Sequence, residues 1–296
     1  MLPVLSIGDC LVDTVEIRPG SSERHPGGAG LNLAVGLSRL GPSSGLVARV
    51  GADPDGFRLR RYLRDEGVRL FETRTVDPTG VVMSSRLNGE PAYSFAPIML
   101  RRRIAFTDPT ITAMADAEAV AVNSFPFDNP GQVAALLEAL QRASGLIVVD
   151  PNPRRRLIAD MAAFRDGAEQ AFARSSIAKI SDEDADLLYG ETDVEVVARL
   201  LSLGIQTVLF THGSDGAAIH TRDGLEVRVP IAERPDPIVD TMGAGDATLA
   251  TAIAFILRHG LPRSQTGWRA CLEEAMRVAA ATCRRAGGGL VSLPLA

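Results

Sequence analysis

Short apolar runs alternate with longer amphipathic stretches along most of the chain. Runs of four to eight apolar residues separated by helical periodicity indicate buried strands of a parallel sheet joined by helices. The pattern predicts strands at 4–7, 45–50, 119–122, 146–150, 176–180 and 207–211, and helices at 33–40, 54–66, 130–143, 161–173, 194–203, 247–258 and 268–285. The sequence therefore predicts an α/β fold in which helices cover both faces of a mainly parallel sheet.

Extended pieces in the first third of the chain show a different pattern, because polar and apolar residues alternate in them. They lie at 70–74, 80–87 and 92–96, and a further strand that carries Asp13 is predicted at 11–17. A strand that alternates in this way has one face open to solvent. Asn88-Gly89, between the last two pieces, is typical of a hairpin turn. We expect a small second sheet, with a turn-rich connection at 18–26, and no linker long enough to separate two independent domains.

Composition narrows the classes of function. The 296 residues are 46% hydrophobic and carry a net charge of −5 with both signs mixed, which argues against a nucleic-acid-binding surface or a basic membrane face. Cys10, Cys271 and Cys283 lack paired spacing, so neither a disulfide framework nor a zinc site is indicated. No charged-then-apolar leader and no apolar run of ~20 residues is found, so we expect a cytoplasmic protein. The only lysine, Lys179, follows no glycine loop, which excludes a P-loop.

The stretch from Asp240 to Asp246 joins a glycine-rich turn to an apolar helix. The free N–H groups and the dipole of a helix N-terminus bind a phosphate or an oxyanion without a basic side chain. Asp246 would stand beside that anion, where a carboxylate can accept the proton of an attacking hydroxyl. The alternative is that Asp240 and Asp246 only cap the helix and the glycines only make a turn.

Other polar or glycine-rich loops fall at the predicted carboxyl ends of strands, where ligands bind in open α/β sheets. They lie at 8–13, 27–32, 150–154, 179–184 and 211–216. Taken singly, each has a structural interpretation: Asp13 as a solvated strand residue, Asn32 as a helix cap, and 213–216 as a hairpin turn. Taken together, they predict one ligand-binding edge.

Five motifs occur in an order that is similar to that of a known family. They are Gly27-Gly28-x-x-x-Asn32, Val50-Gly51-x-Asp53-x-x-Gly56, Asp150-Pro151-Asn152-x-Arg154, Thr211-x-Gly213-Ser214-x-Gly216 and Asp240-Thr241-x-Gly243-Ala244-Gly245-Asp246. Over nearly its whole length the chain resembles the ribokinase-like, or PfkB, family of carbohydrate kinases. The resemblance implies a doubly wound, mainly parallel sheet in a single domain, 1–296. It also implies a small β-sheet lid over the sugar, built from about 11–18 and 70–97.

The activity implied by the resemblance is transfer of the γ-phosphoryl group of ATP to a sugar hydroxyl. By similarity, Asp246 is the catalytic base, and the amides of Gly243, Ala244 and Gly245 stabilise the transferred group. The implied substrate-binding residues are Asp13, Gly28, Asn32 and Asp246. The implied nucleotide-binding residues are Lys179, Ser181, Thr211, Gly213, Ser214 and Gly216. The family also implies Mg²⁺ with Asp184 in its shell, a monovalent cation such as K⁺ near Asp240, and a homodimer through the lid strands.

Some positions depart from the family pattern or leave the substrate open. Ser181-x-x-Asp184 stands where many members have Asn-x-x-Glu, so an altered metal shell is expected. The start of the chain and the Lys-x-Ser-Asp-Glu run look fructokinase-like; 2-keto-3-deoxygluconate, ribose or a nucleoside are alternative substrates. A non-catalytic sugar-binding protein is the alternative of another class, whereas a Rossmann dehydrogenase is excluded because GxGxxG is missing. Arg101–Arg103 is interpreted as a solvated loop, with contact to an anionic substrate as the alternative.

Overall fold

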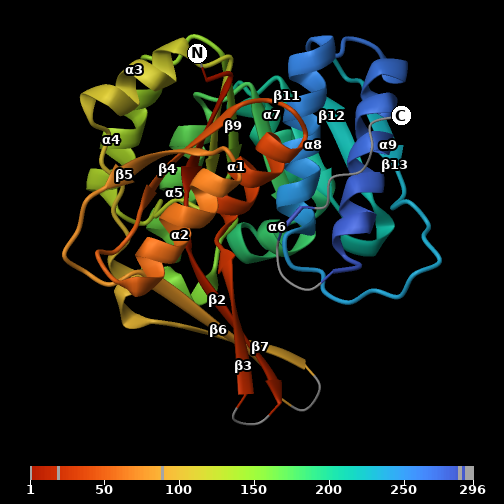
Figure 1. The fold of residues 1–296 in the computed structure, drawn as a ribbon. Helices are drawn as coiled ribbons and strands as arrows, with labels where there is room; N and C mark the ends of the chain where they lie inside the picture. Colours follow the sequence, from red (N-terminus) through yellow and green to blue (C-terminus); the bar gives the residue numbers. More distant parts are fainter. Residues whose placement is uncertain (1, 19–20, 88–89, 286–288, 291–296) are drawn as a thin grey trace.

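A nine-stranded sheet forms the centre of the computed structural model, which describes residues 2–18, 21–87, 90–285 and 289–290 (Figure 1). From one edge to the other its strands are β13 (Glu226–Val229), β12 (Ala217–Thr221), β11 (Thr207–Thr211), β10 (Ile177–Ser181), β9 (Leu146–Asp150), β8 (Ala119–Asn123), β1 (Val4–Gly8), β4 (Ser44–Arg49) and β5 (Arg69–Thr73). All neighbours pair in parallel except β11 with β12 and β12 with β13. The predicted mainly parallel sheet is confirmed.

Helices cover both faces of this sheet. One face carries α1 (Ala29–Arg39), α2 (Pro54–Asp65), α8 (Ala244–His259) and α9 (Gln265–Thr282). The other carries α3 (Asp108–Asp116), α4 (Pro130–Leu140), α5 (Met161–Phe172), α6 (Asp182–Leu188) and α7 (Asp193–Ser202). Short 3₁₀ turns occur at Pro97–Arg101, Arg155–Leu157 and Gly213–Asp215. Within the described residues, no helix has the length and apolarity of a membrane span.

Burial on both faces explains why the central strands are apolar without interruption. In β8, Val120 and Val122 pack into the core under α3 to α7, while Ala119 and Ala121 pack into the core under α1, α8 and α9. Successive side chains of a strand point to opposite faces, so both sets must be apolar when both faces are covered. A polar side chain inside a strand must then find a partner within the protein, as Ser6 does by donating to Gly30 O at 3.0 Å, whereas the strand ends can carry polar groups that face a ligand.

The second sheet has four strands and projects from the carboxyl edge of the main sheet (Figure 1). Its order is β3 (Ser21–Gly27), β2 (Leu11–Arg18), β6 (Gly80–Leu87) and β7 (Glu90–Phe95). β2 follows β1 after only Asp9 and Cys10, so the two sheets are joined directly. β6 and β7 pair antiparallel as expected, and the turn predicted at Asn88-Gly89 lies outside the described residues.

Two assignments around this sheet are wrong. The piece at 70–74, expected in the small sheet, is β5 of the main sheet: it pairs in parallel with β4, and Phe71 packs into the main core. Polar and apolar residues alternate in β5 because it is an edge strand, whose side chains are buried on one face of the sheet only. The connection expected to be turn-rich at 18–26 contains β3, which pairs antiparallel with β2. Cross-strand pairing outweighs the turn propensity of its Ser and Pro residues.

Close approach between α1 and β1 requires glycine at Gly30. A Cβ at this position would lie 2.7 Å from the carbonyl carbon of Gly8 and 3.0 Å from Asp9 N. Gly30→Ala should therefore push the start of α1 off the sheet at a cost of about 1–3 kcal/mol. We expect a fall of several degrees in Tm, measured by differential scanning fluorimetry. Gly131→Ala in α4 is the control, because its nearest contact is an ordinary 3.4 Å; equal losses in both variants would contradict this explanation.

Candidate active site

Helix α8 begins with a glycine turn at the carboxyl edge of the main sheet. Gly243, the residue before the helix, has a left-handed backbone with φ 77°, which favours glycine. Asp240 accepts a hydrogen bond from Met242 N at 2.9 Å, and Ala244 N donates to Thr241 O at 3.3 Å. The first amides of a helix lack intrahelical acceptors, and the dipole adds positive charge. The turn is therefore suited to an anion, although the Ala244 amide is engaged within it.

Asp246 lies in the first turn of α8 and is only 9% exposed. Asn32 donates from Nδ2 to Asp246 Oδ2 at 3.0 Å, and Asn123 donates from Nδ2 to Asp246 Oδ1 at 2.9 Å. Burial raises the pKa of the Asp246 carboxyl, and the two amide donors oppose this rise. A buried, oriented carboxylate of raised basicity is suited to accept a proton near neutral pH.

Asp13 on β2 is a second buried carboxylate at the same edge. Its pKa is raised to about 7, mainly by burial and further by the charges of Asp240 and Asp246, whereas Arg154 lowers it. A Cβ on Gly27 would come within 1.8 Å of Asp13 Oδ2, so the carboxylate lies directly against the end of β3. Asp13 is therefore not the solvated strand residue of the structural interpretation.

The start of α1 completes this part of the site. Gly28 has φ 99°, and a Cβ there would lie 2.5 Å from Asp9 O. Leu31 N donates to the same carbonyl at 3.0 Å, which fixes the helix start against the loop after β1. Asn32 does not cap the helix: its side chain is in the first turn and reaches Asp246. Asn32 Oδ1 is buried and has no hydrogen-bond partner within the described part of the chain, so the site lacks one donor.

Lys179 lies below the glycine turn and is 4% exposed. Its Nζ is 3.0 Å from Asp150 Oδ2, 3.8 Å from Asp184 Oδ2 and 3.4 Å from the Cβ that a side chain at Gly245 would have. Burial favours a low pKa for Lys179, but the two carboxylates raise it on balance. Burial raises the pKa of Asp150 to about 7, although Lys179 lowers it. A cation thus lies directly behind the anion-binding turn.

Ser181 and Asp184 are engaged with each other at the start of α6. Ser181 Oγ accepts from Asp184 N at 3.1 Å, and Asp184 Oδ2 accepts from Ser181 N at 3.0 Å. This reciprocal capping box explains why the seven-residue α6, which helical periodicity did not reveal, forms here. The cap uses only one oxygen of Asp184.

The nucleotide-binding motif predicted at 211–216 follows β11. Thr211 is the register partner of Ser181 on β10, so the two predicted segments are neighbours in space. Gly213 and Ser214 are exposed, and Gly216 has φ 101°, where a Cβ would lie 2.1 Å from Val229 O. The structure therefore brings this motif to the same edge as Lys179, with backbone rather than bulky side chains at its surface.

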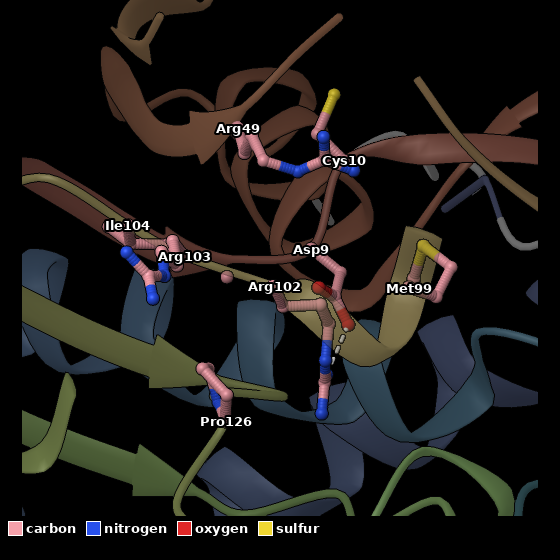
Figure 2. A pocket seen from close by; sticks show the side chains of 9 residues that line it. Asp9, Cys10, Arg49, Met99, Arg102, Arg103, Ile104 and Pro126 are labelled. Atoms are coloured by element: carbon pink, nitrogen blue, oxygen red, sulfur yellow. Dashed lines mark hydrogen bonds and ion pairs between the residues drawn. The ribbon is translucent and has the colours of Figure 1, made fainter. Parts of the chain in front are cut away.

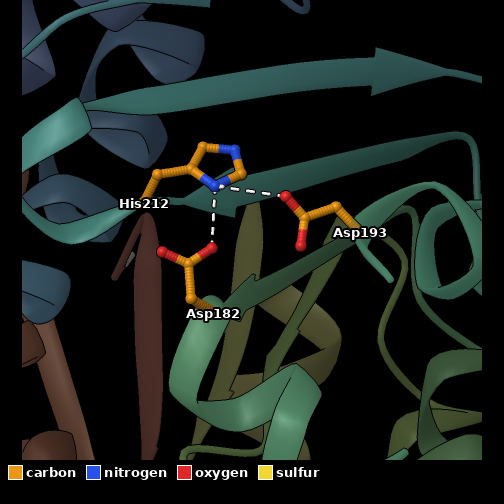
Figure 3. Close-up of side chains that lie close together, drawn as sticks. All are labelled: Asp182, Asp193 and His212. Atoms are coloured by element: carbon orange, nitrogen blue, oxygen red, sulfur yellow. Dashed lines mark hydrogen bonds and ion pairs between the residues drawn. The ribbon is translucent and has the colours of Figure 1, made fainter. Parts of the chain in front are cut away.

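His212 lies beside two carboxylates at this edge (Figure 3). Its Nδ1 is 2.7 Å from Asp182 Oδ1 and 3.6 Å from Asp193 Oδ2, and its ring stacks on Phe210. The 2.7 Å distance is that of a hydrogen bond from Nδ1–H to Asp182 Oδ1. Nε2 is buried without a partner among the described residues.

A small hollow behind the loop after β1 has about 320 Å³ of empty volume, part of it open to solvent (Figure 2). Arg102 in its wall is 8% exposed and pairs with Asp9 Oδ2 at 2.8 Å, while Ser124 Oγ donates to the same oxygen at 3.0 Å. The solvated-loop interpretation is therefore wrong for Arg102, although Arg101 and Arg103 are exposed. The ion pair fixes the loop that leads into β2.

Asn123 and Arg154 contribute to the site although their residue types and positions predicted no role for them. Asn123 ends β8 and is fully buried, yet it donates directly to Asp246. Arg154 follows β9, and its charge lowers the pKa of Asp13 and of Asp246. In the sequence, each is recognisable only as a polar residue at or soon after the end of a buried strand. That position does not predict which residue the side chain contacts.

Comparisons with known proteins agree along the whole chain. The family model for pfkB family carbohydrate kinases matches residues 1–295. A fructokinase of Klebsiella pneumoniae is 32% identical over 300 residues, covering 97% of this chain and 95% of the relative. An aminoimidazole riboside kinase of Salmonella typhimurium is 30% identical over 303 residues, covering 99% and 92%.

The fold agrees as well. The crystal structure of a fructokinase from Xylella fastidiosa with bound ATP superposes with a TM-score of 0.83 at 21% identity, covering 97% of this chain and 94% of that one. This likeness confirms the doubly wound fold with its separate small sheet. The protein belongs to the pfkB family of carbohydrate kinases, phosphotransferases that act on a sugar hydroxyl.

Proposed function

We propose that the protein is an ATP-dependent, fructokinase-like sugar kinase that transfers the γ-phosphoryl group of Mg-ATP to a sugar hydroxyl. The observation that carries this proposal is Asp246: a buried carboxylate with raised pKa, held by two amides at the start of a helix whose glycine turn suits an anion. A general base beside an anion site is the minimum that phosphoryl transfer to a hydroxyl requires.

The sugar would lie between the small sheet, acting as a lid, and the start of α1. Asp13 supplies hydrogen-bond acceptors there, and the unpartnered Asn32 Oδ1 is suited to accept a hydrogen bond from a sugar hydroxyl. Gly28, with its positive φ and no room for a Cβ, lets the sugar approach the backbone. These three residues would orient one hydroxyl toward Asp246.

In the reaction, that hydroxyl loses its proton to Asp246 as its oxygen forms a bond to the γ-phosphorus. The bond between the γ-phosphorus and the β–γ bridging oxygen breaks, and ADP leaves with that oxygen. The amides of Gly243, Ala244 and Gly245 would donate to the charged oxygens of the transferred group, the Ala244 amide in exchange for its 3.3 Å bond to Thr241 O. Preorganised donors of this kind are worth about 3 kcal/mol or more each in other enzymes.

The nucleotide would lie along the ends of β10 and β11. The proposed contacts are Lys179, Ser181, Thr211, Gly213, Ser214 and Gly216. Carboxylates crowd this edge and raise one another's pKa values, so the residues present fit a divalent cation with oxygen ligands. Asp184 would hold Mg²⁺, which neutralises phosphate charge when bound, and Asp240 would contact a monovalent cation such as K⁺.

Fructose is the first substrate to test, because fructokinases are among the relatives at about 30% identity. The alternatives are 2-keto-3-deoxygluconate, ribose and a nucleoside, and one relative at 30% identity is a riboside kinase. A non-catalytic sugar-binding protein is the alternative of another class; it would have no need of a buried, oriented base. ADP release from Mg-ATP over a panel of these compounds tests all of them.

Asp246→Asn should abolish sugar-dependent ADP release. Loss of a general base costs about 10²–10⁴-fold in kcat. The amide keeps the size of the side chain, and rotation of the Asn32 amide can present its Oδ1 to the new NH2 group, so the fold should persist. The thermal shift caused by the sugar reports binding separately from turnover. Asp116→Asn, which makes the same change at an exposed position of α3, is the control and should leave turnover unchanged. Full turnover in Asp246→Asn would exclude Asp246 as the base.

Asp13→Asn should change how stability depends on pH. The folded-state pKa of about 7 lies above the ordinary value of 3.8 for an aspartate, so between these values the folded protein binds more protons than the unfolded chain. Stability contributed by this group is therefore present at low pH and is lost as pH rises through about 7. Relative to wild type, Asp13→Asn should gain several degrees of Tm between pH 5 and pH 8. A constant difference across this range would contradict the raised pKa.

A further inference from the structure

We infer that Asn123 is a positioning residue that gives the two Asp246 oxygens different roles. Asn123 holds Oδ1 to the main sheet, and Oδ2 accepts the proton of the substrate. The inference rests on the proposed function, and it assigns a role to a residue outside the motifs on which that proposal was built. Its basis is the pair of hydrogen bonds that Asp246 receives from opposite sides.

The orientation of the Asn123 amide is fixed by three partners. Its Nδ2 donates to Asp246 Oδ1 at 2.9 Å and to Ala29 O at 3.4 Å, and its Oδ1 accepts from Asn152 Nδ2 at 3.3 Å. If the amide were reversed, its oxygen would face the acceptors Asp246 Oδ1 and Ala29 O, and its NH2 group would face the donor Asn152 Nδ2. Asn123 is fully buried, so these contacts satisfy its polar atoms in place of bulk solvent.

Two residues in or next to this network have a strained, left-handed backbone. Ser124, directly after β8, has φ 57°, and Asn152, two residues after β9, has φ 41°. Left-handed backbones at non-glycine residues persist where the surroundings hold them, and they cluster at functional sites. Ser124 is held by a bond from its N to Asp150 O at 3.2 Å. Asn152, one of the two strained residues, donates to Asn123, and Asn123 in turn donates to Asp246 Oδ1.

The two oxygens of Asp246 accept hydrogen bonds from different residues, and only one of these residues has a polar atom left for a substrate. Beyond Oδ2 lies Asn32, whose remaining polar atom, Oδ1, is buried without a partner in the described part of the chain. A hydroxyl that donates to Asn32 Oδ1 would lie beside Asp246 Oδ2. Oδ1 accepts from Asn123, whose own side-chain oxygen accepts from Asn152. In the transfer the proton therefore moves to Oδ2, while the bond from Asn123 keeps the carboxylate in place and favours its ionised form.

The test is the pH dependence of kcat/KM, which reports ionisation of the free enzyme. Asn123→Ala removes a donor to the Asp246 carboxylate, so the acidic limb of the profile should move up by about one pH unit. At a pH well below the pKa of Asp246, kcat/KM should fall about ten-fold. At high pH, part of this loss should be recovered. Asn123→Asp, which places an acceptor beside Asp246 Oδ1, should move the acidic limb to a still higher pH. Asn152→Gly keeps the left-handed backbone and should give a smaller shift in the same direction.

Asn129→Ala is the matched control. Asn129 caps α4 by accepting from Gln132 N, so its loss should lower Tm without moving the pH profile. If Asn123→Ala fails to fold, Asn152→Gly carries the test. Unmoved acidic limbs in both the Asn123 and Asn152 variants, with Asp246→Asn inactive, would overturn this inference and leave the proposed function standing. A wild type that releases no ADP with any sugar would instead overturn the proposed function.

Discussion

Burial of negative charge at one edge of the main sheet is the constraint on which the site depends. Asp13, Asp150 and Asp246 lie within it at no more than 9% exposure, and burial raises the pKa of each. Such carboxylates are tolerated only where donors or cations face them. Lys179 faces Asp150, and Arg154 lowers the pKa of Asp13 and Asp246. The chain therefore keeps a reactive carboxylate buried by surrounding it with fixed partners.

Close backbone approach is what makes these partners available. Gly8 and Gly30 let β1 and α1 come together, so that Asn32 in the first turn of α1 reaches α8. Asn123 reaches the same carboxylate from β8, the strand beside β1. Helices and strands hold side chains more precisely than loops do. Asp246, the proposed base, is thus held between two rigid elements of the main fold, while Asp13 comes from the small sheet.

The replacement of the family's usual Asn-x-x-Glu by Ser181-x-x-Asp184 has a local explanation. Ser is a strong N-cap residue, and a carboxylate three residues later can return the hydrogen bond. The structure has both bonds, so the pair stabilises the short α6 directly beside Lys179. Helix capping by itself explains why oxygen-bearing side chains suit both positions.

The sequence alone determined the alternation of strand and helix, because burial on both faces makes each central strand apolar, as in β8. It also located the glycine turn before Asp246 and the edge where the motifs meet, since parallel strands end together. It did not place β5 or β3, because pairing partners distant in the chain decide which sheet a strand joins. Nor could it show the contact of Asn123 with Asp246, which are 123 residues apart. Only the tertiary structure brings them within hydrogen-bonding distance, because that contact depends on how β8 packs beneath the start of α8.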